Sequence, residues 1–281
     1  MAQLAHKFMN MDRRIIFILL ALAVLIPLLH GPLNLPVKAS PEVRSIYDKI
    51  ESMTPGSVLL ISIDFGPSTK PELYPMSEAL IRHAFARDLR VVGMTLWIVG
   101  IGISSELMSR LGSEYGKTYG EDYVYLGWAP GAFNVIVGMG QDIYRTFPQD
   151  YYGTSTASMP VLQGVRTLRD IDYVVDIATG DPGIEAWIVY GREKYGFELG
   201  GGCTAVTAPG MYIYINSGQI NGLMGGMRGA AEYETLIERT GQATVGMDVQ
   251  SVAHLLIIVL IVASNAAYFV TRFKQRGGTG T

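Results

Sequence analysis

Two apolar runs, one near each end of the 281-residue chain, constrain its structure more than any other feature. Residues 15–29 contain no charged side chain, and the run has 21 residues if it continues to Leu35. Residues 251–270 form a second run of 20 residues without a charge. Because about 20 apolar residues can cross a bilayer as a helix, we predict transmembrane helices at residues 15–35 and 251–270.

The first run has an alternative, because its flanks also suit a cleaved signal peptide. Basic residues precede it, and Val37-Lys38-Ala39 has the small-residue spacing of a cleavage site. The alternative for the second run is a buried helix of a soluble protein. That alternative fits poorly with 20 uncharged residues followed at once by Arg272, Lys274 and Arg276.

The basic residues flank both runs on their terminal sides, which indicates an orientation in the membrane. The formal charges of residues 1–39 sum to +3, and those of the residues after 270 sum to another +3. Since the whole chain has a net charge of −3, residues 40–250 carry a net charge of −9 (−3 − 6 = −9). Lys and Arg are retained on the cytoplasmic side. We therefore predict a cell-membrane protein with both termini, residues 1–14 and 271–281, in the cytoplasm and an extracytoplasmic domain at residues 40–248.

Between the two runs, short strand-like segments alternate with helical ones. The predicted strands lie at residues 58–63, 90–99, 123–127, 171–178 and 203–207. The predicted helices lie at residues 75–87, 105–115, 133–147, 183–195 and 216–238. Such alternation requires crossover connections, which cover both faces of a sheet with helices. The prediction is a mainly parallel, three-layer α/β domain that is flavodoxin-like or Rossmann-like.

Ligands of open parallel sheets bind at the carboxyl ends of the strands, and small polar residues follow several predicted strands. The ligand-binding candidates are Asp64, Ser68, Thr69, Ser104, Thr179 and Asp181. A strand-end acid can orient a hydroxyl ligand, and hydroxylated residues at a helix start can bind an anion. The alternatives are a simple turn for the loop at Asp64 and an N-cap, at Ser104, for the helix predicted from Ser105.

The motifs of several chemistries are absent from the sequence. There is no phosphate-binding loop and no G-x-S-x-G nucleophile motif, and Ser105 stands where a dinucleotide fingerprint needs a third glycine or alanine. No H-E-x-x-H motif occurs, so we expect neither a metal nor a cofactor. With a net charge of −3 we expect no nucleic-acid partner.

For three further residues we favour a structural interpretation over a catalytic one. Asp172 and Asp176 lie on the same face of a predicted strand and could form a carboxylate pair, but such residues are more often solvated strand ends. Cys203 follows three glycines and could be a nucleophile, but it is expected to be buried and inert.

A glycine-rich segment near residue 225 places small residues on one helical face. These helix-packing candidates are Gly222, Gly225, Gly226 and Gly229. One hypothesis is close helix packing between subunits or against the sheet; the alternative is a glycine-rich loop before a helix that starts near Gly229. The acidic residues Glu232, Glu234 and Glu238 then form an expected exposed face.

Asn265 is the only strongly polar side chain near the inner half of the second run, and it is a further helix-packing candidate. The expected partners are therefore the lipid bilayer and either a second copy of the chain or another membrane protein. An interfacial position is the alternative for Asn265.

Three stretches carry a resemblance: Pro71–Met76 (PELYPM), Asp150–Gly153 (DYYG) and Gly229–Glu234 (GAAEYE). They resemble an uncharacterised group of bacterial membrane-anchored proteins with two terminal helices around one domain. The resemblance implies that organisation and assigns no activity and no role to any residue.

Two functions are compatible with these observations. The first is a non-enzymatic membrane-anchored subunit whose extracytoplasmic domain binds a partner protein or a small ligand in a membrane assembly. The second is an extracytoplasmic hydrolase or transferase that uses the strand-end loops. The second requires that these loops converge on a pocket with a carboxylate of perturbed pKa.

Overall fold

The structure is a computed structural model that describes residues 11–33 and 35–277. It divides into two compact units. One comprises Val37–Thr244, and the other comprises Met1–Pro36 together with Val245–Thr281. We describe each unit by itself.

The unit Val37–Thr244 contains one six-stranded sheet in which all pairs of neighbouring strands are parallel. The strands are β1 (Val58–Asp64), β2 (Arg90–Met94), β3 (Tyr123–Tyr125), β4 (Tyr173–Ala178), β5 (Leu199–Cys203) and β6 (Gly222–Gly225). Their order is β3-β2-β1-β4-β5-β6. This order confirms the predicted Rossmann-like or flavodoxin-like class, with six strands where the sequence predicted five.

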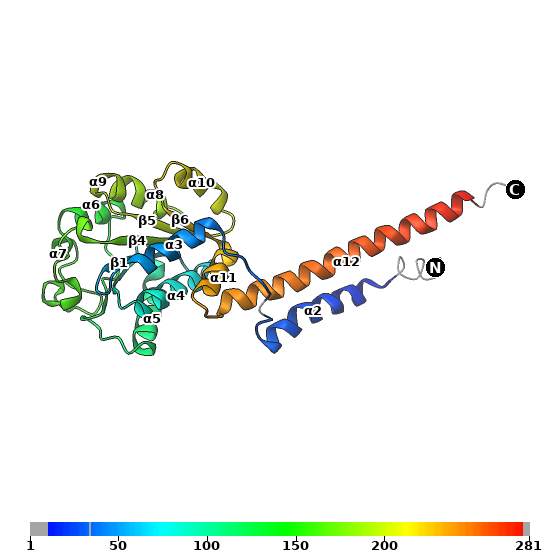
Figure 1. Ribbon diagram of the computed structural model, residues 1–281, viewed down its shortest axis with the longest axis horizontal. Coiled ribbons are helices and arrows are strands. Elements are labelled where there is room, and N and C mark those ends of the chain that lie inside the picture. The colour runs from blue at the N-terminus through cyan, green and yellow to red at the C-terminus, as the bar shows by residue number, and fades with distance from the viewer. Residues whose placement is uncertain (1–10, 34, 278–281) are drawn as a thin grey trace. The chain divides into compact units, whose positions relative to one another are not determined.

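Helices cover both faces of the sheet, as crossover connections require (Figure 1). On one face lie α3 (Pro41–Ser52), α4 (Lys70–Ala86), α5 (Ile101–Glu114) and α11 (Gly226–Leu236). On the other lie α6 (Phe133–Gln141), α8 (Ile184–Ala186), α9 (Glu193–Tyr195) and α10 (Ala208–Asn216). The predicted helix 133–147 is interrupted at Asp142, after which α7 (Ile143–Thr146) begins.

The central strands β1 and β4 are buried along their whole length. Their sequences, VLLISID and YVVDIA, are mostly aliphatic because both faces pack against helices. The exceptions are Ser62, Asp64 and Asp176, which are fully buried polar residues. In the parallel register Ser62 lies opposite Asp176, so the two acids belong to adjacent strands at the same end of the sheet.

The fifth strand lies earlier in the chain than predicted. We predicted residues 203–207 as a strand preceded by a glycine loop, but β5 is Leu199–Cys203 and contains the three glycines themselves. A Cβ at Gly200 would lie 2.2 Å from the Tyr173 hydroxyl, and a Cβ at Gly202 would lie 2.5 Å from Ile177 Cδ1. Large side chains of β4 therefore occupy the space that β5 leaves empty.

The helix predicted at residues 216–238 is wrong over its first half. Gly222 and Gly225 lie in strand β6, and α11 starts at Gly226, whose φ is 61°. The small residues nevertheless allow close approach. A Cβ at Gly222 would lie 2.4 Å from the Glu42 carbonyl oxygen on α3, and one at Gly229 would lie 2.9 Å from the backbone of Met224.

The acidic residues of α11 do not form the exposed face that we expected, because Glu232 and Glu234 are buried. Glu232 accepts hydrogen bonds from the backbone N–H and the hydroxyl of Ser40, at 2.9 and 2.6 Å. Glu234 accepts from the backbone N–H groups of Gly241 and Thr244, at 3.0 and 2.8 Å. Each carboxylate satisfies donors at a helix N-terminus, so burial does not leave it unpaired.

In the other unit the described residues form α2 (Arg13–His30) and most of α12 (Gln242–Gly277), which begins at the end of the first unit. By length and composition both helices are candidate membrane spans, since an 18-residue stretch has a mean hydropathy of 2.1 in α2 and of 2.2 in α12. The Asp248 carboxylate of α12 accepts hydrogen bonds from the backbone N–H groups of Leu33 and Leu35, at 2.7 and 3.3 Å. This carboxylate ties the segment that follows α2 to α12.

Candidate functional site

The strand order changes direction between the carboxyl ends of β1 and β4. From β1 the chain continues toward β2 and β3, whereas from β4 it continues toward β5 and β6 on the other side. The loops that follow β1 and β4 therefore diverge to opposite directions, and this switch point is where open α/β sheets bind ligands. The predicted candidates at residues 64–69 and 179–181 lie on these two loops.

Three of the predicted ligand-binding residues meet at the switch point. The hydroxyl oxygens of Thr69 and Thr179 are 2.7 Å apart, and either can donate to the other. The backbone N–H of Thr179 donates to the carbonyl oxygen of Asp64 at 3.1 Å. Ser68 and Asp181 are exposed beside them on the same loops.

Ser104 is not the N-cap that the sequence offered as an alternative, and its role in ligand binding stays a prediction. Helix α5 begins at Ile101, so Ser104 lies inside the helix and does not cap a helix starting at Ser105. Its buried hydroxyl donates to the carbonyl oxygen of Gly100 at 2.9 Å. The N-cap prediction failed because Ile98–Gly100 forms a helical turn that starts the helix earlier.

Asp64 is fully buried, and donors from β1 and from the loop after β2 hold its carboxylate. Oδ1 accepts from the backbone N–H of Leu96 at 2.5 Å and from the hydroxyl of Thr95 at 3.2 Å. Oδ2 accepts from the hydroxyl of Ser62 at 2.7 Å. Three donors can stabilise a negative charge on this carboxylate despite its burial.

Asp176 is the second buried acid, and its environment is different. Among the described residues, neither of its side-chain oxygens has a hydrogen-bond donor. Burial and the nearby Asp64 charge raise the pKa of Asp176 well above its usual value. Burial also raises the pKa of Asp64 to about 6, although the hydrogen bonds from Leu96, Ser62 and Thr95 oppose that rise. Two buried neighbouring carboxyls with raised pKa values favour a state in which Asp176 is protonated and neutral beside a charged Asp64, so the pair holds one proton.

The loop after β4 covers Asp176. Gly183 lies so close that a Cβ there would be 2.3 Å from the Gly180 carbonyl oxygen and 3.5 Å from Oδ2 of Asp176. The indole N–H of Trp97 donates to the carbonyl oxygen of Pro182 at 2.7 Å and holds this loop to the loop after β2. Only glycine fits at residue 183 without moving the backbone.

A small cavity of about 90 Å³ lies beside this loop. Its lining residues are Ala178, Gly180, Asp181, Gly183, Ile184, Glu185, Cys203, Thr207 and Met211. Cys203 is buried there as predicted, and burial raises the pKa of its thiol to about 12. A thiol of that pKa is protonated at neutral pH and is a poor nucleophile.

Sequence reasoning did not identify Asp176 as a site residue. The sequence suggested a carboxylate pair of Asp176 with Asp172. Asp172 is exposed at the start of β4, and its carboxylate accepts a hydrogen bond from the backbone N–H of Val58 at 2.7 Å. The partner is instead Asp64 on the neighbouring strand. The signal was available in the β1 and β4 sequences, because each has an acid near its carboxyl end.

No metal cluster accompanies the pair: residues 11–33 and 35–277 contain no group of three or more His, Cys, Asp or Glu side chains that could hold a metal ion. Asn265, the remaining helix-packing candidate, is exposed on α12, and its packing role stays a prediction.

No protein-family model, curated protein or solved structure matches the chain. Its fold class therefore rests on the parallel register and the strand order. Of the resemblance described above, the structure supports the organisation of two long apolar terminal helices, which is consistent with membrane anchoring.

Proposed function

We propose that the chain is a membrane-anchored binding subunit whose α/β domain lies outside the cytoplasm and binds a small polar ligand at the switch point. The two apolar terminal helices and their basic outer flanks support the anchoring and the orientation. The domain then presents its strand-end loops outside the cell membrane, and the ligand is one that carries hydrogen-bond donors.

The observation that carries this proposal is the unpartnered Asp176 carboxyl beneath the loop that follows β4. A buried oxygen without a donor costs about 1–3 kcal/mol. A hydroxyl or ammonium group that reached Asp176 would recover that free energy. Thr69 and Thr179 offer hydroxyl groups on the two loops at the switch point, and Asp181 offers an exposed carboxylate on the loop after β4.

Ligand access requires movement of the loop Gly180–Gly183. Gly180 has no heavy atom within 4 Å of its Cβ position, and Asp181 is exposed. The neighbouring cavity of about 90 Å³ gives the loop some space on its far side. This loop is the part of the site that we expect to adjust when a ligand binds.

A hydrolase or transferase is the second candidate function, and one observation favours it. The pKa of Asp64 is raised to about 6, which is close to the value that a general acid or base needs near neutral pH. However, Asp64 already accepts three hydrogen bonds from neighbouring residues. A catalytic Asp64 would have to exchange some of these donors for the substrate, whereas the unpartnered Asp176 can accept a ligand donor without losing one, so binding is the better-supported function.

The proposal is tested with the full-length chain in detergent and three probes, D-ribose, myo-inositol and ethanolamine. Saturation-transfer NMR detects which of them bind. We expect Thr179→Val and Asp181→Asn to reduce the signal of the bound probe several-fold. The control is Asp172→Asn, at the opposite end of β4, which should leave the signal unchanged.

Two outcomes would count against binding at this site. One is that none of the three probes gives a saturation-transfer signal with the native chain. The other is that Asp172→Asn weakens the signal as much as Thr179→Val does. Hydrolysis of an added p-nitrophenyl riboside to ribose and p-nitrophenol, at a rate that Asp64→Asn abolishes, would instead support the enzymatic alternative.

A further inference from the structure

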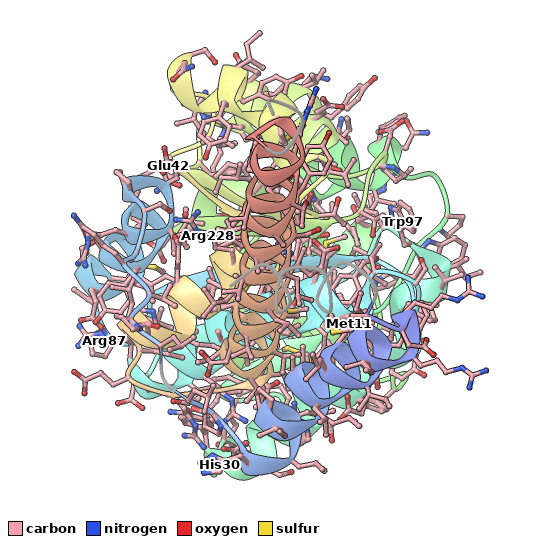
Figure 2. The ribbon with its side chains drawn as sticks, turned by 90° about the vertical axis from the view of Figure 1, so that its right-hand side faces the viewer. Met11, His30, Glu42, Arg87, Trp97 and Arg228 are labelled. Atoms are coloured by element: carbon pink, nitrogen blue, oxygen red, sulfur yellow. The ribbon has the colours of Figure 1, made fainter. Side chains whose placement is uncertain are left out.

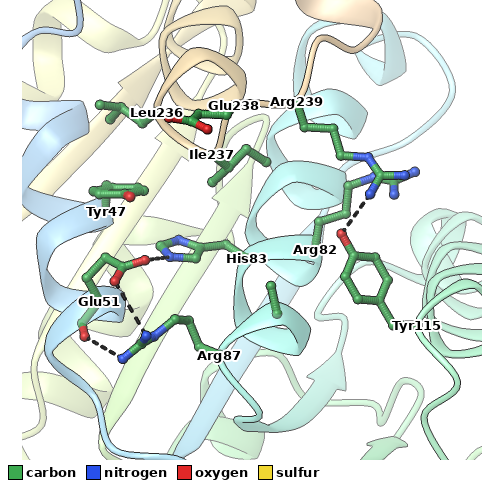
Figure 3. Close-up of a pocket in the computed structure, with 11 residues that line it drawn as sticks. Tyr47, Glu51, Arg82, His83, Arg87, Tyr115, Leu236, Ile237, Glu238 and Arg239 are labelled. Atoms are coloured by element: carbon green, nitrogen blue, oxygen red, sulfur yellow. Dashed lines mark hydrogen bonds and ion pairs between the residues drawn. The ribbon is translucent and has the colours of Figure 1, made fainter.

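A second and larger cavity, of about 470 Å³, lies between α3, the end of α4 and the turn after α11 (Figure 3). Its polar lining includes Tyr47, Glu51, Arg82, Arg87, Tyr115 and Arg239. Arg87 and Trp97, which mark this cavity and the switch point, lie toward opposite sides of the domain in Figure 2. The cavity is therefore separate from the switch point.

Fixed aromatic side chains form one wall of this cavity. His83 is buried, with Nδ1 2.8 Å from the Tyr233 hydroxyl and Nε2 2.8 Å from Oε1 of Glu51. The Tyr47 ring stacks on the imidazole, with centroids 4.8 Å apart and an interplanar angle of 21°. Because burial lowers the pKa of His83, the imidazole is neutral at pH 7 and adds no charge to the cavity.

Three guanidinium groups from two segments line the same cavity (Figure 3). Two come from α4 and the residue that follows it, Arg82 and Arg87, and the third is Arg239 from the turn before α12. The acidic side chains in the lining are Glu51 and Glu238. With His83 neutral, the side chains that line the cavity carry three positive and two negative charges, and Glu78 and Glu114, which pair with these arginines from outside the lining, add two more negative charges.

The three guanidinium groups differ in how fully they are paired. Arg82 is bound to Glu78 at 2.7 Å and also to Glu114. Arg87 donates to the backbone carbonyl oxygen of Glu51 at 3.0 Å, its nearest carboxylate oxygen is 3.7 Å away, and its Nε has no partner among the described residues.

Arg239 is the most accessible of the three. Its side chain is half exposed, and it donates to the Tyr115 hydroxyl at 3.2 Å while pairing with Glu114. Arg239 and Arg87 can therefore turn toward an anion in the cavity without breaking a buried ion pair.

We propose that this cavity binds a phosphate-bearing anion. Guanidinium groups match phosphate oxygens with paired N–H donors, and donors on several sides suit a group with three or four oxygens better than a carboxylate with two. The apolar wall of Leu236 and Ile237 and the volume of about 470 Å³ leave space for the rest of the molecule.

Phosphate chemistry at this place has two natural sources. Arg239 is followed after two residues by α12, a candidate membrane span, so a phospholipid headgroup is one source. A free phosphate compound is the other. The inference does not depend on the ligand proposed for the switch point.

The test uses the full-length chain in detergent and ³¹P NMR linewidths during titration with two probes, inorganic phosphate and dihexanoylphosphatidylglycerol. We expect Arg239→Gln and Arg87→Gln each to raise the dissociation constant about tenfold, as loss of a charge-assisted hydrogen bond does. The matched control is Arg166→Gln, an exposed arginine paired with Asp142 on a different part of the domain, which should leave it unchanged.

The two probes separate the two sources. Broadening of both resonances, or of inorganic phosphate alone, supports a free phosphate compound, and broadening of the lipid resonance alone supports a headgroup. Dihexanoylglycerol, which lacks the phosphate, should not compete with either. The inference is overturned if dihexanoylglycerol competes, if neither probe binds, or if Arg239→Gln binds as tightly as Arg166→Gln. Because Arg239 is half exposed, its substitution leaves the fold intact, and near-ultraviolet circular dichroism checks this.

Discussion

Asp64 and Asp176 have the same functional group, yet their surroundings assign them opposite charge states. Asp64 accepts from three donors, whereas Asp176 has none among the described residues. In the unfolded chain both carboxyls lose their protons near pH 4. In the folded chain the pKa of Asp64 is about 6 and that of Asp176 is well above its usual value. The folded state therefore binds more protons above pH 4, and its free energy of unfolding falls as the pH rises.

We expect Asp176→Asn to raise the free energy of unfolding at pH 8 by about 1 kcal/mol, because the folded chain then no longer holds a carboxyl whose pKa is raised by burial. The amide has nearly the shape of the carboxyl group and cannot ionise. Asp64→Asn should instead lower it by about 1–3 kcal/mol, because an amide NH₂ would face the donors that now bind the carboxylate. Chemical denaturation of the full-length chain in detergent at pH 5 and pH 8 measures both effects.

The two variants serve as controls for each other, because each removes one carboxyl from the same pair. The Asp176→Asn protein should also lose most of the fall in stability between pH 5 and pH 8. If both substitutions destabilise the chain equally at pH 8, the two acids do not share a proton in the way inferred here.

The sequence predicted part of this site. Asp64, Thr69 and Thr179 were identifiable because each follows a recognisable aliphatic strand, and strand ends are where ligands bind. Asp176 was not, because an isolated strand sequence does not reveal which residue lies opposite. The register between β1 and β4 places Ser62 opposite Asp176. The two strands are far apart in the chain: Val58 and Asp172, which are hydrogen-bonded at their starts, are separated by 114 residues.

At the scale of elements, β5 and β6 show why the sequence predicted the outer strands less well. The inner strands β1 and β4 are rich in β-branched and aliphatic residues, which favour strands intrinsically. The sequences of β5 and β6, LGGGC and GLMG, have little strand propensity. Neighbouring side chains such as Ile46 of α3 and Tyr173 of β4 fill the space beside their glycines, so tertiary packing determines these strands.

Gly222→Ala tests this explanation. A Cβ at residue 222 would lie 2.4 Å from the Glu42 carbonyl oxygen and 2.7 Å from Ile46 Cγ1, so α3 must move away from β6. We expect the free energy of unfolding to fall by about 1–3 kcal/mol, the usual cost of overpacking. Thermal unfolding of the full-length chain, followed by near-ultraviolet circular dichroism, measures it.

The matched control is Gly102→Ala on α5, where no heavy atom lies within 4 Å of the Cβ position. Because alanine favours a helix over glycine by up to about 1 kcal/mol, this variant should be as stable as the native chain or more so. If Gly222→Ala is equally harmless, the close approach of α3 to β6 does not explain the glycine at residue 222.

At the scale of the whole molecule, helix α11 forms hydrogen bonds with both the first and the last residues of the domain. Its Glu232 receives the N–H of Ser40, just before α3, and its Glu234 receives the N–H groups of Ala243 and Thr244 at the start of α12. Both contacts are made by this one short helix. The domain is therefore attached at both ends through the same helix, and the two segments that continue toward the candidate spans start close to each other.

The proposed orientation makes a prediction about accessibility in intact cells. In a Cys203→Ala background, Arg166→Cys places a thiol at an exposed position of the domain, and Thr281→Cys places one after the second span. Since the ends carry +6 and residues 40–250 carry −9, and basic flanks stay in the cytoplasm, an impermeant maleimide should label only the thiol at residue 166. The thiol at residue 281 should react once the cells are lysed.

The opposite labelling pattern would refute the orientation, and recovery of the chain in the supernatant after membranes are pelleted would refute the anchoring. The native Cys203 should stay unlabelled in intact cells because it is buried and its thiol pKa is about 12.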